Sequence, residues 1–360
     1  MLKTILYIGA SLLLCGLSTG AGSATLIPIV PVPGSCDGCT GVIGINNNNI
    51  IAGTYSTPDF VQHGYLGPLD GSDYVTFDYG GNATATEARA INDDGWVTGM
   101  GIDEDCSPFG LCEFVRQPDG TILNIEKDGA ILQGTVQGIT TGENLVGDYG
   151  TQDGKFGYQG QGGNYMQDFA LPCCTADAVR PRGINASGAV AGYYFSNRTH
   201  GFVFQNGIAM KIDYPDTKAH FTFVEGLNDK GLVAGSWTNK RQRVTHAFKL
   251  NTATGTFTSL DVPGMHFVTQ AWAPNNAGLI PLDSDAGVYI YCPRKKSKCP
   301  AAANAIEIPD APSIRMPASY FHMQSCRRGC TERGAATRAN AGRMLDTRRR
   351  KLRPSLRMSP

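Results

Sequence analysis

The sequence predicts an all-β protein built from a repeated unit of about 45 residues. Glycine and proline supply 45 and 20 of the 360 residues, and charged residues only 17%, which is typical of many turns and few long solvated helices. A glycine- and asparagine-rich turn, first seen as GINNNNIIAGTY at Gly44–Tyr55, recurs along the chain. Short runs rich in β-branched and aromatic residues separate its copies, as strands do.

The recurring turn sets the period of the chain. Its six copies begin at Gly44, Ala90, Gly138, Gly183, Gly226 and Ala273, at intervals of 43 to 48 residues. Such constant spacing indicates a repeat architecture. Asn49 stands where most other copies have glycine, so we expect a positive φ there, which asparagine tolerates better than other non-glycine residues. The polar run is therefore predicted to be a hairpin turn.

Each copy carries four runs of strand length. One run precedes the turn and a second follows it; then come an aromatic run, such as HGFVF from His200, and a strand ending in a turn, such as FTSLDVPG from Phe257. Four short strands per repeat is what a β-propeller blade requires. Blades must pack on one another around an axis, since one small sheet cannot bury both faces. We predict a β-propeller of about six four-stranded blades, with seven blades or an open arrangement as alternatives.

The two ends of the repeat region resemble each other. IPIVPVPG at residues 27–34 precedes the first turn, and AIEIPDAP at residues 305–312 follows the last. One terminal strand is therefore expected to complete a blade begun at the other end, in a propeller spanning residues 25–312.

The pattern GINxxGxxxG, followed by HGF and LDVPG, resembles the HAF family of extracellular repeat proteins, named for a short His-Ala-Phe-like signature. The signature stands at His246–Phe248 and, in variant form, at His200–Phe202 and His63–Tyr65. The second and third copies depart from it, with Cys112–Phe114 and Phe156–Tyr158 in its place. The resemblance covers roughly residues 26–312. It implies an extracellular, propeller-like protein and no particular reaction.

Residues 1–24 have the pattern of a secretory signal peptide. Lys3 is followed by an apolar run from Ile5 to Leu17 and by small residues ending at Ala24, where cleavage is expected. The run is shorter than the ~20 apolar residues that cross a bilayer, so we predict no transmembrane span. Lipid attachment at Cys15 is a less favoured alternative, because the preceding leucine is bulky for that signal. We expect the chain to be secreted, periplasmic or at the cell surface.

Cleavage would leave ten cysteines, an even number that indicates disulfides in an exported protein. The candidates are Cys36 with Cys39, Cys106 with Cys112, Cys292 with Cys299, Cys326 with Cys330, and the neighbours Cys173 and Cys174. A bond between neighbours is strained, so one of the last two is expected to reach another loop. Zinc at Cys36 and Cys39 is an alternative, since their spacing is half that of a structural site.

Histidines and aspartates recur at fixed positions of the repeats. His63, His200 and His246 begin aromatic runs, and Asp78, Asp213 and Asp261 precede turns. Three imidazoles converging on an axis could bind a metal, and axial carboxylates could serve a glycosidase. Repetition favours structural roles instead: a hydrogen bond within each blade for the histidines and turn capping for the aspartates.

The densest carboxylate cluster is Asp103, Glu104 and Asp105. It is a calcium candidate, because hard cations prefer oxygen ligands, although a solvated hairpin tip would carry the same charges. No other cofactor is predicted. The sequence has no G-x-S-x-G elbow, Walker loop or HExxH helix, so no catalytic residue is predicted either.

Residues 313–360 form a basic tail with twelve basic and two acidic residues, although the whole chain is balanced at 31 each. We expect this tail to be disordered. It could contact anionic surfaces. Apart from Tyr320 and Phe321 it lacks the aromatic residues that stack on bases, so no specific nucleic-acid binding is predicted.

Two functions fit this architecture. The favoured one is a secreted, non-enzymatic module that presents loops on one face to an extracellular ligand such as a polysaccharide or a protein. The alternative is a carbohydrate-active lyase or glycosidase with its site at the axial mouth. An enzyme should bring non-repeating acids and bases within ~6 Å of one another in the central funnel.

Overall fold

The computed structural model describes residues 23–325, apart from Gly81, residues 107–108, 172–177, 242–243, 294–298 and 301–303, Asp310 and His322. Its regular elements are strands and one 3₁₀ helix, η1 (Ala318–Tyr320). No helix among these residues is long and apolar enough to cross a membrane. The all-β prediction is confirmed.

The strands follow the predicted repeats, which we number 1 to 6. Repeat 1 contains β2 (Thr40–Ile45), β3 (Ile50–Ser56), β4 (Gln62–Pro68) and β5 (Val75–Phe77). Repeat 2 contains β6 (Ala85–Ile91), β7 (Val97–Ile102), β8 (Leu111–Arg116) and β9 (Ile122–Asn124), followed by the hairpin β10 (Glu126–Lys127) and β11 (Ala130–Ile131). Repeat 3 contains β12 (Gly134–Ile139), β13 (Asn144–Thr151), β14 (Gly154–Gln161) and β15 (Asn164–Phe169).

The second half of the chain repeats this order. Repeat 4 contains β16 (Ala178–Ile184), β17 (Val190–Phe195), β18 (Thr199–Gln205) and β19 (Ile208–Ile212). Repeat 5 contains β20 (Ala219–Leu227), β21 (Leu232–Asn239), β22 (Thr245–Asn251) and β23 (Thr256–Ser259). Repeat 6 contains β24 (Thr269–Ala271), β25 (Ile280–Ser284) and β26 (Gly287–Cys292), and β1 (Ser23–Pro28) joins it.

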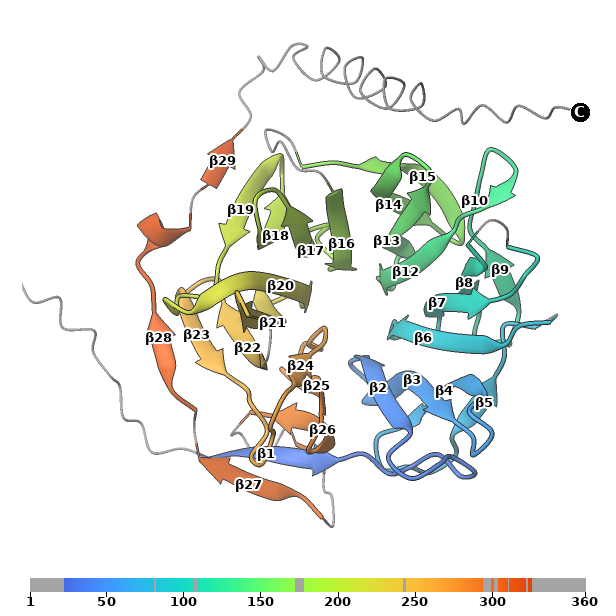
Figure 1. Ribbon diagram of the computed structural model, residues 1–360, viewed down its shortest axis with the longest axis horizontal. Coiled ribbons are helices and arrows are strands. Elements are labelled where there is room, and N and C mark those ends of the chain that lie inside the picture. Colours follow the sequence, from blue (N-terminus) through green and yellow to red (C-terminus); the bar gives the residue numbers. More distant parts are fainter. Residues whose placement is uncertain are drawn as a thin grey trace, which may run out of the picture. The chain divides into compact units, whose positions relative to one another are not determined.

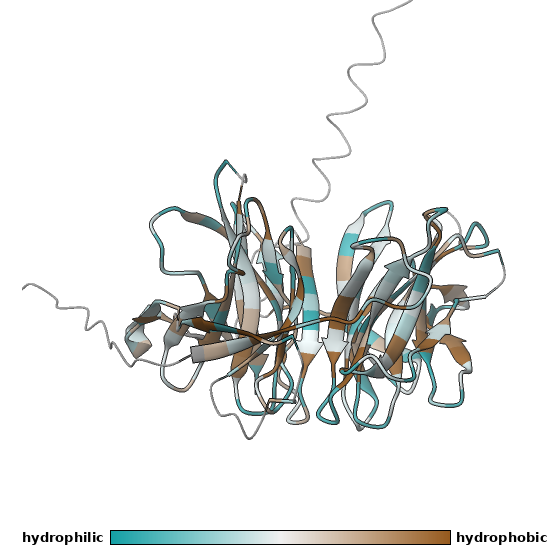
Figure 2. Ribbon diagram, turned by 90° about the horizontal axis from the view of Figure 1, so that it is seen from below, coloured by the Kyte–Doolittle hydropathy of each residue, from teal (hydrophilic) through white to brown (hydrophobic). Residues whose placement is uncertain are grey.

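Each repeat folds as an antiparallel sheet with its strands in sequence order. The first strands β2, β6, β12, β16, β20 and β24 lie innermost around a common axis (Figure 1). A single parallel pair, Gln62 with Ala85, joins the sheets of repeats 1 and 2. Brown apolar segments alternate with paler ones within the strands, and many turns are teal (Figure 2). The arrangement is propeller-like.

The turns have the predicted conformation. Asn49 has a φ of 60°, and its counterparts Gly95, Gly188, Gly231 and Gly278 have φ between 73° and 86°. The first residue of each motif has a different role. A Cβ atom on Gly138 would lie 2.9 Å from the Cα of Gly183, and one on Gly183 would lie 2.9 Å from the Cα of Gly226. The motif therefore begins with a small residue because neighbouring first strands touch there.

The N-terminal strand completes the last repeat, as predicted. β1 pairs along its length with β26, from Thr25 opposite Cys292 to Pro28 opposite Tyr289. Leu26 and Ile27 are buried in this position. The first and last repeats are therefore joined through the N-terminus.

The chain after repeat 6 runs back along the outer edges of the sheets, in segments that we call the outer strap: β27 (Ile306–Pro309), β28 (Ser313–Arg315), η1 and β29 (Met323–Ser325). β27 pairs with β1 and β28 with β23, and β29 is the strand next to β19. The strap covers polar backbone groups that edge strands leave open. The prediction of disorder from residue 313 was therefore wrong at its start, and residues 326–360 lie outside the described part.

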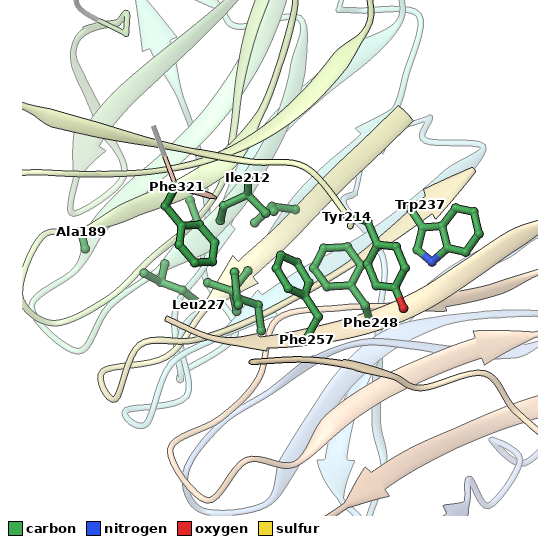
Figure 3. Packing of buried hydrophobic residues seen from close by; sticks show 12 residues of the cluster. Ala189, Ile212, Tyr214, Leu227, Trp237, Phe248, Phe257 and Phe321 are labelled. Atoms are coloured by element: carbon green, nitrogen blue, oxygen red, sulfur yellow. The ribbon is translucent and has the colours of Figure 1, made fainter. Parts of the chain in front are cut away.

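The strap also adds to the hydrophobic core. Phe321 is buried in the cluster between repeats 4 and 5, beside Ile212, Leu227 and Phe257 (Figure 3). The Phe257 and Phe321 rings stack with centroids 6.2 Å apart. The strap is thus anchored by apolar packing as well as by strand pairing.

Candidate functional site

A cavity of about 130 Å³ lies on the axis, where the first strands of all six repeats meet. Its wall is formed by the end of each first strand and the start of the following turn, for example Ile43–Asn47 and Arg89–Asp93. Every repeat supplies equivalent positions to the cavity wall. Positions at which the repeats carry different residues are therefore the candidates for a specific function.

In five of the six repeats an asparagine of the turn links the repeat to the next around the cavity, and repeat 3 has Thr140 at this position. Asn46 Nδ2 donates to the Asn92 carbonyl oxygen at 2.9 Å, and Asn275 Nδ2 donates to the Asn46 carbonyl oxygen at 3.0 Å. Equivalent bonds join Asn92 to Thr140, Asn185 to Asn228 and Asn228 to Asn275. We call these residues the asparagine ring. The bond from Asn275 to Asn46 connects repeat 6 directly to repeat 1.

The residue just before the first motif position varies among the repeats, and only arginine occurs twice. These six residues, which we call the axial residues, are Ile43, Arg89, Gln137, Arg182, Glu225 and Trp272, and all line the cavity. The sequence signal for them was available, since each precedes a small residue that does repeat. The repeated pattern does not mark these residues, because they are positions that vary from repeat to repeat.

The charged axial residues all have ion-pair partners. Arg182 Nε lies 2.7 Å from Glu225 Oε2, and Arg182 Nη1 lies 4.0 Å from Asp148 Oδ1. Arg89 pairs with Glu87 on its own strand. Burial acts to lower the pKa of Arg182, but Glu225 and Asp148 more than offset this, so its pKa is raised. Burial lowers the pKa of Arg89, with a further contribution from Arg182.

Two buried donors on the axis are left open. Arg89 Nε and Trp272 Nε1 have no hydrogen-bond partner among the described residues. The Arg89 guanidinium lies 5.6 Å from the centroid of the Trp272 ring. Buried N–H groups of this kind are stabilised by an acceptor oxygen.

Non-repeating acids and bases therefore converge on the axis, as the enzyme alternative requires. General acid–base catalysis also needs a group that exchanges a proton near the working pH. The Arg182 guanidinium, with its raised pKa, is held as a cation by two carboxylates. This paired network with two open donors suits the binding of an acceptor group better than proton transfer.

A buried carboxyl group lies outside the cavity, between repeats 2 and 3. Glu113, fully buried, accepts a hydrogen bond from Tyr158. Burial raises its pKa well above the ordinary value, and Asp148 adds to the effect. Glu113 and Tyr158 lie in repeats 2 and 3, the two copies that depart from the histidine signature. This departure was the sequence signal for the pair.

The repeated histidines form pairs with the repeated aspartates. The Nδ1 atoms of His63, His200 and His246 lie 2.6 to 2.7 Å from carboxylate oxygens of Asp78, Asp213 and Asp261. Each pair stays within one repeat, as the structural interpretation expected. No three His, Cys, Asp or Glu side chains gather to hold a metal in the described part of the chain.

The acidic cluster sits at the β7–β8 connection. Asp103 is buried, and its carboxylate accepts backbone N–H groups of Asn82 and Asp105 at 3.2 and 3.0 Å. Glu104 and Asp105 are both exposed. Asp103 thus has a turn-capping role, and calcium at Asp103, Glu104 and Asp105 stays a prediction.

Three of the expected disulfides are present: Cys36–Cys39, Cys106–Cys112 and Cys292–Cys299, with Cα atoms 5.2, 5.5 and 5.8 Å apart. Each disulfide closes a short loop. The bond between Cys36 and Cys39 leaves no free thiol at these two residues to bind zinc. Cys173, Cys174, Cys326 and Cys330 lie outside the described residues.

No family model and no curated protein matches the chain. Solved structures match at low identity. TolB from Acinetobacter baumannii is 12% identical over 74% of this chain and 65% of its own, with a TM-score of 0.46. AofleA from Arthrobotrys oligospora is 11% identical over 82% and 89%, with a TM-score of 0.44. Virginiamycin B lyase from Staphylococcus aureus is 11% identical over 81% and 97%, with a TM-score of 0.40.

Proposed function

We propose that this chain is an exported, non-enzymatic β-propeller of six blades, of the HAF type, that binds an extracellular polysaccharide through the loops of one face. The six blades are supported by the six repeats, by β1 in repeat 6 and by the bond from Asn275 to Asn46. Export is supported by three disulfides, which persist in oxidising compartments.

The observation that carries the binding role is the position of the exposed phenylalanines. Strand directions place the connections between second and third strands, and those between repeats, on the face opposite the asparagine turns; we call it the loop face. Phe60, Phe109, Phe195 and Phe267, from 43% to 84% exposed, all lie on these connections or at their edge. Aromatic side chains, phenylalanine included, are enriched in interfaces relative to the rest of a protein surface.

A polysaccharide suits this face. Phenylalanine offers a flat, rigid apolar surface at low entropic cost, and these rings come from repeats 1, 2 and 4 and from the connection between repeats 5 and 6. They are therefore spread around the axis, as contacts to an extended polymer would be. The paired axial charges favour this role over a lyase or glycosidase.

The test is a glycan array probed with the mature protein. We expect binding to at least one polysaccharide, and a loss of about tenfold or more in affinity when Phe60→Ser and Phe267→Ser are combined, because aromatic anchors dominate interfaces. The matched control combines Met166→Ser and Ile208→Ser, which are also exposed but lie away from the loop-face connections.

Two results would overturn the proposal. One is equal loss of binding in the loop-face and control variants, or no glycan bound at all. The other is cleavage of a bound glycan, detected by chromatography of the incubated sample, which would favour the enzyme alternative.

A further inference from the structure

A cleft of about 460 Å³ lies between repeats 4 and 5 beneath the outer strap. Arg198, Lys211 and Asp213 from repeat 4 line it, and Ser319 and Tyr320 of the strap close one side. Its volume is in the range of small-molecule pockets. This site was not foreseen from the sequence, because it needs the strap to fold against the propeller.

The cleft is built on one of the repeated histidine–aspartate pairs. His200 Nδ1 lies 2.6 Å from Asp213 Oδ1, and His200 itself is buried. Tyr320 donates from its hydroxyl to the Asp213 carbonyl oxygen at 3.1 Å. The pair and the strap therefore fix the position of the carboxylate.

Repeat 4 adds two cations to the pair that the other copies lack. Arg198 Nη2 and Lys211 Nζ lie 3.1 and 3.2 Å from Asp213 Oδ2. Two places before the histidine, repeats 1 and 5 have Val61 and Val244. Two places before the aspartate, they have Thr76 and Ser259. The cations are thus not required by the repeated fold.

Arg198 and Lys211 together have more N–H donors than Asp213 accepts. One carboxylate faces an arginine, which has five N–H donors, and a lysine, which has three, and each uses one of them on Asp213. Both side chains are 30% exposed. Burial acts to raise the Asp213 pKa, but His200, followed by Lys211 and Arg198, holds it below its ordinary value. The carboxylate is therefore neutralised, and an excess positive charge faces the cleft.

We propose that this cleft binds an oxyanion group, a carboxylate or a sulfate, carried on a saccharide. Arg198 and Lys211 would donate charge-assisted hydrogen bonds to the oxyanion. The hydroxyl of Ser319 and the half-buried ring of Tyr320 line the space beside it. The inference deepens the proposed function, on which it rests for the saccharide, by naming an acidic saccharide as the ligand.

Titration calorimetry of the full mature chain tests the proposal with three probes: trigalacturonate, a chondroitin sulfate tetrasaccharide and neutral maltotriose. We expect at least one acidic probe to bind and maltotriose not to bind. Comparing the two acidic probes distinguishes carboxylate from sulfate. Combining Arg198→Gln with Lys211→Gln should weaken acidic binding by about tenfold or more.

The matched control combines Lys240→Gln with Arg241→Gln, two exposed cations on the β21–β22 connection of repeat 5. It removes the same charge from the same face but leaves the cleft intact, and the basic tail is identical in both variants. We expect its affinity to stay within about twofold of the wild type. Equal weakening in the two variants would mean general attraction by charge and would overturn the proposal.

Hydrogen exchange gives a local measurement that does not depend on a variant folding. Whichever acidic probe binds in calorimetry should protect peptides that contain Arg198, Lys211 and Tyr320, and unchanged exchange there at saturation with that probe would overturn the proposal. The two proposals can fail separately. If the Phe60 and Phe267 variant keeps acidic binding and the Arg198 and Lys211 variant loses it, the cleft stands and the phenylalanine argument fails.

Discussion

Glu113 shows how one residue within a repeated motif changes its neighbourhood. Repeats 4 and 5 have Gly201 and Ala247 at the same motif position. A carboxyl group in this buried place needs a partner, and the Tyr158 hydroxyl of repeat 3 provides one. Tyr65, the counterpart of Tyr158 in repeat 1, has no partner for its hydroxyl among the described residues. Between repeats 2 and 3, a buried hydrogen bond from Tyr158 to Glu113 thus stands where other repeats have a small apolar residue.

The raised pKa of Glu113 makes stability depend on pH at this residue. The group is neutral when folded, so its contribution is fully present below its unfolded pKa and is lost as the pH rises toward the folded pKa. Glu113→Gln removes the titration and keeps the shape. We expect the variant to gain on the order of 1–3 kcal/mol relative to wild type between pH 4 and pH 8.

Urea unfolding of both proteins at the two pH values measures this gain. The matched control is Glu104→Gln, an exposed carboxyl group on the preceding β7–β8 connection, whose replacement should change stability little. If Glu113→Gln shifts stability by the same amount at both pH values, Glu113 is not held neutral.

At the scale of elements, the sequence predicted strands and turns well because each is encoded locally. Asn49 and its glycine counterparts need a positive φ whatever surrounds them. The asparagine ring was not predicted, since each bond reaches the next repeat and a period in the sequence does not show which atoms meet across it. The cleft beneath the strap was missed for a related reason. Its walls come from residues more than 100 positions apart, such as Asp213 and Tyr320.

The strap from residue 313 onward was predicted to be disordered because its strands are short and because it was grouped with the basic residues that follow it from Arg327. Pairing with existing sheet edges supplies what three or four residues cannot provide alone. A chain ending at Pro312 should therefore be less stable than the full chain. Loss of the buried Phe321 side chain alone costs about 3–5 kcal/mol by analogy with core Phe→Ala substitutions.

Thermal unfolding compares this chain with a control that ends at Ser325 and keeps the strap. We expect the shorter chain to melt at least several degrees lower. The control should match the full chain, because residues beyond 325 are predicted from the sequence to be disordered. Equal melting of all three would mean that the strap does not contribute to stability.

At the scale of the whole molecule, repeat 6 is completed by a strand from the opposite end of the sequence. Predicted cleavage after Ala24 would keep Thr25–Pro28, the residues that pair with β26, and would remove only Ser23 and Ala24 of β1. A mature chain beginning at Thr25 should therefore keep the pairing of β1 with β26. A chain beginning at Val30 lacks β1, including the buried Leu26 and Ile27, each of which contributes about 1.5–3 kcal/mol.

Amide hydrogen exchange on these two chains distinguishes a closed ring from the open arrangement that the sequence also allowed. In an open array each repeat depends on its nearest neighbours, so loss of β1 should speed exchange only in repeats 1, 5 and 6. In a ring held by β1 and by the bond from Asn275 to Asn46, opening one junction releases strain and support on both sides. We expect faster exchange in repeat 3 as well, and unchanged exchange there would contradict a closed ring.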